Sequence, residues 1–378
     1  MTDGGAKPTT GGAGTDAMGD AGTPGAPGSA AVGGASGAGG ASGSMGGLSE
    51  TDGGAGGEGG SSGCNGEQAC NVGPSCADGL DCYGVACCTG LLVPGGTFSM
   101  GESTNGSDAL CINNAYNGFA CSSTNKPEHS ATVSSFVLDA FEVTVGRFRR
   151  FVSAFEGAPP DVGAGAHRNI AFSGWQSAWN TELASSRAEL ISRLKCDSSQ
   201  TWTDSVGLNE SAAINCVSWY EAFAFCAWDG GYLPSEAEWE YAATGGEDNR
   251  PFPWGSANPA DVVNLANDAF NGNNPAIAVG SEHPQGDGKW GHRDLAGGVS
   301  EWVLDLNNNT WYSSGGATCD DCANLNAGTS RVVRGGSWAV TDYYNGLSFV
   351  IGLRAADREA AAAADRQTTI GFRCARAR

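Results

Sequence analysis

Basic residues and histidines are scarce in this chain. Lysine and arginine together number 20, against 41 aspartates and glutamates, which gives a formal net charge of −21, and there are 4 histidines. Nucleic acids and anionic membrane surfaces select basic patches, so this balance argues against both as partners. The acidic residues are scattered rather than gathered in runs, which is typical of a solvated surface and, less specifically, of affinity for cations.

Aromatic residues are missing from the N-terminal segment. Residues 1–62 consist almost entirely of Gly, Ala, Ser, Thr, Asp and Pro, whereas all 11 tryptophans follow residue 170. A segment of this composition cannot bury enough apolar surface to offset its ordering entropy, so we expect a disordered tether. No stretch of the sequence is long and apolar enough to span a bilayer.

Common catalytic signatures are also absent. The sequence contains no G-x-S-x-G, no H-E-x-x-H and no phosphate-cradling glycine loop. The histidines lack metal-ligand spacing, and we interpret them as structural or solvated. They are His129, His167, His283 and His292.

Cysteine, by contrast, is abundant, with 14 in the chain. A cluster near the tether has mostly five intervening residues, unlike the C-x2-C pairs of zinc modules, and predicts a small disulfide knot over 63–90. Six cysteines allow fifteen pairings, so the connectivity stays open. The cluster consists of Cys64, Cys70, Cys76, Cys82, Cys87 and Cys88.

Disulfides indicate an oxidising compartment. The first residues, MTDGGAKPTT, carry no signal peptide, so we expect the true export signal to lie upstream of the given start. The Gly/Ala/Ser tract resembles the flexible tether behind the lipid-anchored cysteine of bacterial lipoproteins. We therefore expect an extracytoplasmic protein, in the periplasm or at the cell surface, and a monomer.

The residues from 91 to 378 predict an α+β domain with few regular elements. Thr144 can cap a helix that follows a strand within 129–155. Residues 214–246 contain S-x-x-E twice, the pattern of a capping box, and each helix is followed by paired glycines. Between these regions, residues 156–213 look like an insertion.

Eight motifs follow one another in this domain. They are G-G-x-F-x-M-G (Gly95–Gly101), F-x-L-D-x-F-E-V-T (Phe136–Thr144), V-S-W-x-E-A (Val217–Ala222), L-P-S-E-A-E-W-E-Y-A-A (Leu233–Ala243), F-P-W-G (Phe252–Gly255), D-L-A-G-x-V-x-E-W (Asp294–Trp302), R-x-x-R-G-G-S-W (Arg331–Trp338) and I-G-F-R (Ile370–Arg373). In this order they resemble one known family, the formylglycine-generating enzymes or sulfatase-modifying factors. The resemblance covers about residue 91 to the C-terminus and implies a variant of the C-type-lectin fold, with a long groove that binds an extended polypeptide.

The resemblance implies copper(I) chemistry on a cysteine of a sulfatase, with two metal-binding cysteines shortly after the G-G-S-[WY] element. Those places fall near Val340 and Asn345 here, and no cysteine occurs between Cys322 and Cys374. Copper(I) requires soft thiolate ligands, so we expect no copper. Ser337, which lies beside the metal cysteines in the family, is present. With Trp338, Tyr343 and Tyr344 it is a candidate for lining the groove.

The resemblance also implies a disulfide between Cys226 and Cys374. A second family bridge is absent, because its positions hold Ala243 and, approximately, Ala355. Cys319 and Cys322 form C-D-D-C, which is either a small disulfide in an exposed loop or a replacement thiolate pair for copper. The composition favours the disulfide. The other expected bridges join Cys111 to Cys121 and Cys196 to Cys216.

Calcium is a further cofactor that the resemblance implies. Asn264 and the Leu265 carbonyl match half of one family site, and Asn271 or Asn273 would complete it, so we expect weak binding. A second family site would include Gly298, where the family often has asparagine.

Two functions follow from these expectations. The first is an exported module that binds a peptide or a glycan in its groove without chemistry. The second is an active formylglycine-generating oxidase with non-standard metal ligands. The missing cysteines favour the binding module, because a fold does not carry its function without the site. The position of Cys319 and Cys322 in the structure discriminates between the two.

Overall fold

A computed structural model describes residues 69–71, 73–76, 79–102, 125–256, 266, 275, 277–326, 328–339 and 352–378. Residues 1–62, expected as a tether, lie outside the described residues. So do Val340, Tyr343, Tyr344 and Asn345, the calcium candidates Asn264, Leu265, Asn271 and Asn273, and the cysteines Cys64, Cys111 and Cys121.

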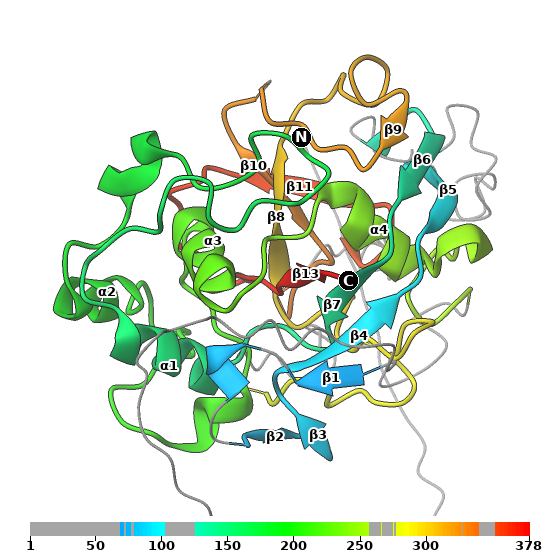
Figure 1. Ribbon diagram of the computed structural model, residues 1–378. Coiled ribbons are helices and arrows are strands. Elements are labelled where there is room, and N and C mark those ends of the chain that lie inside the picture. The colour runs from blue at the N-terminus through cyan, green and yellow to red at the C-terminus, as the bar shows by residue number, and fades with distance from the viewer. Residues whose placement is uncertain are drawn as a thin grey trace, which may run out of the picture. The chain divides into compact units, whose positions relative to one another are not determined.

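In the described residues, the strands form four small sheets (Figure 1). The first has the order β1 (Ala69–Asn71), β4 (Thr89–Val93), β7 (Phe136–Asp139), β13 (Ala375–Ala377), and all its pairs are antiparallel. The second has the order β11 (Arg358–Ala361), β10 (Arg331–Arg334), β8 (Ser300–Leu306), β12 (Ile370–Gly371). The third joins β5 (Gly96–Met100), β6 (His129–Val133) and β9 (Cys319–Asp320), and β2 (Asp81–Cys82) pairs with β3 (Val85–Ala86).

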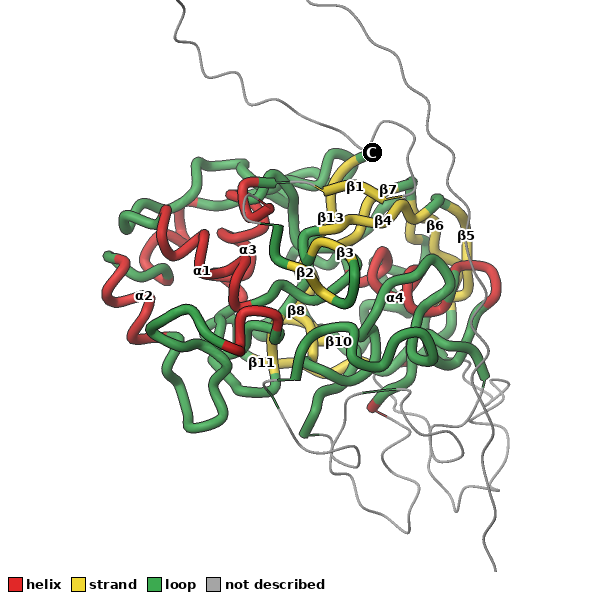
Figure 2. The backbone as a smooth tube through the Cα atoms, turned by 90° about the horizontal axis from the view of Figure 1, so that it is seen from below, coloured by secondary structure: helices red, strands yellow, loops and turns green. Residues whose placement is uncertain are grey.

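The helices separate into two groups. Seen from below, α1 (Val145–Ala154), α2 (Arg187–Arg193) and α3 (Trp219–Trp228) gather on one side, whereas α4 (Glu236–Thr244) lies among the strands (Figure 2). Together with the short strands, this arrangement bears out the α+β class expected from the sequence.

Local sequence signals account for the helix ends. The Thr144 side chain accepts a hydrogen bond from the backbone N–H of Arg147 and caps α1. Ser218 and Ser235 begin α3 and α4 with complete capping boxes, as predicted. Gly245 ends α4 in the left-handed region, with φ of 70°, where a side chain would be strained.

The expected insertion contributes to the main core. Trp175 and Trp179 lie against Phe223 of α3, with ring centroids 5.8 and 5.6 Å apart. The segment also contains α2, whose Leu190 is buried, and Cys196 within it is bonded to Cys216. This segment is therefore packed on the domain rather than projecting from it.

The cysteine-rich segment is joined to the domain by backbone pairing and by buried charge. Its connectivity includes Cys76–Cys88 and Cys82–Cys87. The expected boundary between residues 90 and 91 falls inside β4, which pairs with β1 on one side and β7 on the other. Residues on both sides of that boundary therefore share one sheet.

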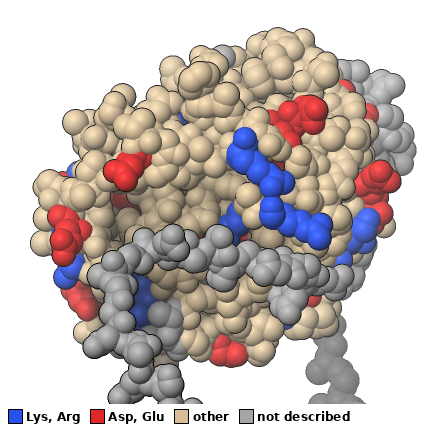
Figure 3. Space-filling view, in the orientation of Figure 1, with Lys and Arg blue, Asp and Glu red and all other residues tan. Residues whose placement is uncertain are grey.

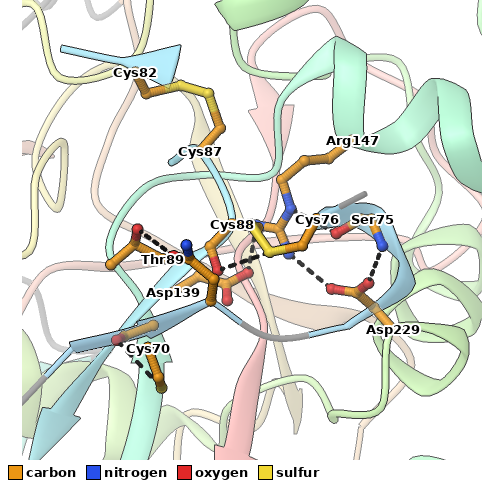
Figure 4. The surroundings of a disulfide bond; sticks show 12 residues. Cys70, Ser75, Cys76, Cys82, Cys87, Cys88, Thr89, Asp139, Arg147 and Asp229 are labelled. Atoms are coloured by element: carbon orange, nitrogen blue, oxygen red, sulfur yellow. Dashed lines mark hydrogen bonds and ion pairs between the residues drawn. A yellow bond between two sulfur atoms is a disulfide. The ribbon is translucent and has the colours of Figure 1, made fainter. Parts of the chain in front are cut away.

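A square of buried charges lies beneath this junction. Arg147 and Arg376 each contact Asp139 and Asp229, at distances of 2.5–2.8 Å, and all four side chains are buried. Ser75 joins the square, because its N–H donates to Asp229 at 2.9 Å and its hydroxyl accepts from Arg147 Nε at 2.9 Å (Figure 4). The knot is thereby attached to the centre of the domain.

Candidate functional site

Two glycines with positive φ turn the chain after β10 and present Ser337. Gly335 and Gly336 have φ of 93° and 69°. A Cβ at Gly336 would lie 2.6 Å from the carbonyl oxygen of Gly352, so no side chain fits there. Ser337 is 5% exposed, and its hydroxyl accepts a hydrogen bond from the N–H of Ala339 at 3.3 Å.

Trp338 anchors this turn. Its N–H donates to the carbonyl of Gly298 at 2.7 Å, and its ring Nε1 donates to the carbonyl of Thr368 at 2.9 Å. The half-buried ring packs against an apolar cluster that includes Phe141 and Val299. Trp338 therefore holds the turn in place, with its one polar ring atom already satisfied.

The residue before the glycines is held by a buried ionic network. Arg334 is fully buried and pairs with Glu240, while Glu236 pairs with Arg358 at 2.8 Å. Burial raises the pKa of Glu240 to about 7, although the Arg334 charge opposes the shift. Such a network fixes the turn rigidly, because breaking any pair would leave a buried charge without its partner.

The C-D-D-C pair is a disulfide within the third sheet. Cys319 bonds to Cys322, and Cys319 is 4% exposed in a cluster with Phe98 and Tyr312. Asp321, between them, accepts hydrogen bonds from the N–H and hydroxyl of Ser134 at 2.7 and 2.6 Å. Among the described residues there is no free cysteine, so this part of the chain offers no thiolate.

Two other predicted pairs are also bonded. Cys226 of α3 bonds to Cys374 just before β13, which is the bridge that the family resemblance implies. Cys196 bonds to Cys216, with a sequence separation of 20. The predicted pair Cys111–Cys121 lies outside the described residues.

Two buried carboxylates flank Gly298, the position implied in the second calcium site. Burial, with the nearby charge of Asp294, raises the pKa of Glu142 well above its ordinary value, and burial raises the pKa of Asp294 to about 6. Glu142 Oε2 is buried and has no hydrogen-bond partner among the described atoms. Both side chains line a cavity of about 10 Å³, the size of one water or one ion.

This arrangement fits a hard cation, which prefers oxygen ligands. A Cβ at Gly298 would lie 2.3 Å from Glu142 Oε1, so the carboxylate occupies the space that an asparagine would need. The described residues hold no group of three or more His, Cys, Asp or Glu suited to a metal, so backbone oxygens would have to complete the shell.

The four histidines differ in their surroundings. His167 bonds to Glu238 at 3.2 Å, and His283 bonds to Asp287 at 2.7 Å. His129 lies against the ring of Tyr312, and His292 is fully buried. Burial lowers the pKa of His292 to about 3, so it is a neutral core residue at neutral pH.

The fold and this turn define a class of protein. The described chain aligns with the structure of PvdO from Pseudomonas aeruginosa, with a TM-score of 0.52 over 77% of this chain and 94% of that one, at 23% identity. The family model of the sulfatase-modifying factor enzyme 1-like domain matches residues 85–378, so the chain belongs to that family.

Its relatives differ in what their names say. The formylglycine-generating enzyme of Streptomyces coelicolor is 27% identical over 75% of this chain and 87% of its own length. The inactive C-alpha-formylglycine-generating enzyme 2 of Bos taurus is 30% identical over 66% and 76%, respectively. A hercynine oxygenase of Mycolicibacterium smegmatis is 30% identical over 67% of this chain and 54% of its own. Family membership alone therefore does not decide activity.

Sequence reasoning missed two features. The contact between Glu142 and the Gly298 turn joins residues more than 150 positions apart, and its only signal was an acid inside an otherwise apolar motif, F-E-V. The docking of Ser75 onto Asp229 has no local signal at all.

Proposed function

We propose that this protein is an exported binding module of the sulfatase-modifying-factor family that does not perform copper-dependent oxidation. The observation that carries this proposal is the lack of thiolates. No cysteine occurs between Cys322 and Cys374, and Cys319 and Cys322 are bonded to each other. Val340 and Asn345, at the places of the metal ligands, cannot bind copper(I).

The ligand that we propose for the surface at the Gly335–Trp338 turn is an extended polypeptide or a glycan. The proposal is supported by a rigid Gly335–Trp338 turn built on buried ionic pairs, which would preorganise a binding surface without supplying a reactive group. Export is supported by five described disulfides, because disulfides form and persist chiefly in oxidising compartments. In the described part of the chain, no helix has the length and apolar character needed to cross a bilayer.

We also propose that a structural calcium ion binds between Glu142 and Asp294, in addition to the site expected at Asn264 and the Leu265 carbonyl. A bound cation would neutralise two buried carboxyl groups whose pKa values are raised by burial. The two carboxylates would hold the ion. The ion would in turn fix the turn at Gly298, whose carbonyl accepts a hydrogen bond from the Trp338 N–H.

Oxygen uptake by the full chain tests the function. The protein is mixed with copper(I) and a cysteine-containing peptide, with the Streptomyces coelicolor enzyme as a positive control. We expect no peptide-dependent oxygen consumption. Turnover would support the alternative, an active oxidase with non-standard ligands. Loss of that turnover in Cys319→Ser/Cys322→Ser would then identify those sulfurs as the ligands.

A further inference from the structure

Buried arginines recur in this fold, and all but one of them contact an acid. Six of the buried arginines form an ion pair with an aspartate or a glutamate. Within the described residues, Arg331, the first residue of β10, forms none. The buried arginines of the described part of the chain are Arg147, Arg331, Arg334, Arg354, Arg358, Arg373 and Arg376.

The charge of Arg331 is not compensated by the protein. The residue is 6% exposed, and burial lowers its pKa to about 10. Burial acts in the same direction on Arg334, but there the charges of Glu240 and Glu236 outweigh it and raise the pKa above its ordinary value. Arg331 stays protonated at neutral pH, so a full charge lies in the core without a counter-charge, which is costly unless a further group supplies one.

Three aromatic rings hold the guanidinium of Arg331. Its central carbon lies 3.5 Å from the ring centroid of Trp219 and 5.7 Å from that of Trp179. The two tryptophan rings are perpendicular, with centroids 5.1 Å apart, and the ring of Tyr220 lies 5.4 Å from that of Trp219. The faces of such rings attract a cation, so they fix the plane of the guanidinium.

The hydrogen bonds of Arg331 leave one edge of the guanidinium open. Nη1 donates to the carbonyl of Leu304 at 2.6 Å. Nε is buried and has no partner, and Nη2 also has none among the described residues. The Tyr220 hydroxyl, which is close enough to act on the pKa of Arg331, likewise forms no hydrogen bond there. Nε and Nη2 together form an edge that can bind two oxygens of one anion through parallel hydrogen bonds.

Acids on neighbouring elements do not supply the missing charge. Asp305 of β8 accepts hydrogen bonds from two backbone N–H groups, and burial raises its pKa to about 7, which weakens it as a counter-charge. Glu221 of α3 is bound to Arg366 at 2.7 Å. Glu182 forms no ion pair with Arg331. The open edge is therefore available to an external anion.

The N-terminus of α3 adds a partial positive charge at the same place. α3 is 10 residues long, and Trp219, on whose ring the guanidinium lies, is its first residue. The start of a helix carries a partial positive charge of roughly half an elementary charge, which favours a nearby anion. The helix and Arg331 therefore act in the same direction.

General electrostatic attraction does not bring anions to this protein. The formal net charge is −21. On the face seen in Figure 3, basic side chains lie in small groups separated by wide uncharged areas. An anion that binds must therefore be held by a local group, and the open edge of Arg331 is such a group.

We propose that Arg331 anchors a small-molecule site for a monoanionic oxyanion, either a carboxylate or a sulfate ester. Nε and Nη2 donate to two of its oxygens, and an aromatic remainder of the ligand lies against the half-buried rings of Trp179 and Tyr220. One guanidinium and one helix end favour a single negative charge over the nearly two of a phosphate monoester. The site lies at the first residue of β10 and shares no residue with the Ser337 turn, so it is independent of the proposed function.

The NMR signals of arginine Nε–H groups in the unaltered full chain test the anchor directly. The ligands are benzoate and phenyl sulfate, and benzamide is the neutral comparison with the same ring. We expect both anions to shift the Arg331 signal with saturation and to bind at least about tenfold more tightly than benzamide, and their order of affinity tells which oxyanion the site prefers. No shift at roughly 10 mM, or equal binding of benzamide, would overturn the inference.

Variants assigned by the same spectra locate the anion. Arg331→Gln should weaken benzoate binding at least about tenfold, and Arg331→Lys, which keeps the charge but lacks the two-point edge, should restore only part of it. The control Arg168→Gln makes the same change in net charge at an exposed arginine and should leave the affinity unchanged. Binding that survives Arg331→Gln would place the anion elsewhere and overturn the inference. No copper or cysteine-containing peptide is present, so these outcomes are separate from the test of the proposed function.

Discussion

Replacing Asp229 by asparagine should destabilise the protein strongly, because it unbalances the buried square of charges. Asp229 Oδ2 lies 2.8 Å from Arg147 and 2.6 Å from Arg376, and the residue is fully buried. The substitution leaves two buried guanidinium groups facing one carboxylate, that of Asp139. Breaking a buried ion pair in this way costs about 3–5 kcal/mol.

The pH dependence of stability gives a second test of the same charges. Burial alone would raise the pKa of Asp139, but the charges of Arg147 and Arg376 outweigh burial and hold the pKa below its ordinary value. The stability that this carboxylate contributes is therefore complete above the ordinary carboxyl pKa and is lost as the pH falls through the depressed one. Asp229→Asn should steepen that loss, because it leaves Asp139 as the only counter-charge.

Denaturant unfolding of the full chain with its disulfides intact measures the effect. The midpoint should fall without a change in slope, since a change in slope would signal a different unfolded state. Asp229→Ala should cost more, because it also removes the acceptor of the Ser75 N–H. Glu247→Gln, which changes the same charge on the surface, should cost less than about 0.5 kcal/mol. A loss below about 1 kcal/mol for Asp229→Asn would refute the reasoning, since it would place the pair among exposed ones.

Three further predictions concern the turn, the carboxylate pair and the disulfide. Gly336→Ala should lower the free energy of unfolding by about 2–4 kcal/mol, because the added Cβ meets a carbonyl oxygen. The control Gly163→Ala, at φ of 88° with nothing within 4 Å of its Cβ, should cost only about 1–2 kcal/mol. Equal losses in denaturant unfolding would contradict the role of the contact. Calcium should raise the melting temperature at pH 7.5 and much less at pH 5. The pKa values of Glu142 and Asp294 are raised, so the stability that their protonated forms contribute is lost as the pH rises through about 6, and a bound calcium ion would replace the lost protons. A shift of the same size in Glu142→Gln would argue for binding elsewhere. Removing the bridge by Cys226→Ala/Cys374→Ala should cost about 5 kcal/mol, from the loop of 148 residues that it closes in the unfolded chain, and an unfolding midpoint unchanged by the substitution would rule that contribution out.

Local features of this fold could be read from the sequence. The caps at Thr144, Ser218 and Ser235 and the stop at Gly245 depend on contacts within a few residues, so the pattern and the structure agree. Phe148, Phe151, Val152 and Phe155 recur at helical spacing in the sequence, which is typical of a core-facing stripe, and all four residues are buried.

Non-local features could not be read in the same way. Ser75 and Asp229 are 154 residues apart, and no pattern links them. The boundary expected after residue 90 followed the change in cysteine density, but β4 continues across it because strand pairing is set by its partners β1 and β7. Likewise, the pairing Cys76–Cys88 depends on the turn that brings these residues together.

At the candidate site, chemistry was more informative than geometry. The absence of cysteine near Val340 and Asn345 is a property of the sequence, since no cysteine occurs between Cys322 and Cys374. The contact between Glu142 and Gly298 could not be predicted in this way, because it depends on how the segment after β7 packs against the Gly298 turn. Only a structure could place that carboxylate.

Copper(I) titration of the full chain against a chromophoric chelator tests the central claim most directly. The account predicts no stoichiometric copper, either for the protein as it stands or for Cys319→Ser/Cys322→Ser. It also predicts that Val340→Cys/Asn345→Cys gains copper binding if the frame of the site is intact. Tight binding of one copper(I) by the unaltered chain would contradict the account, because some other ligand set would then have replaced the missing thiolates.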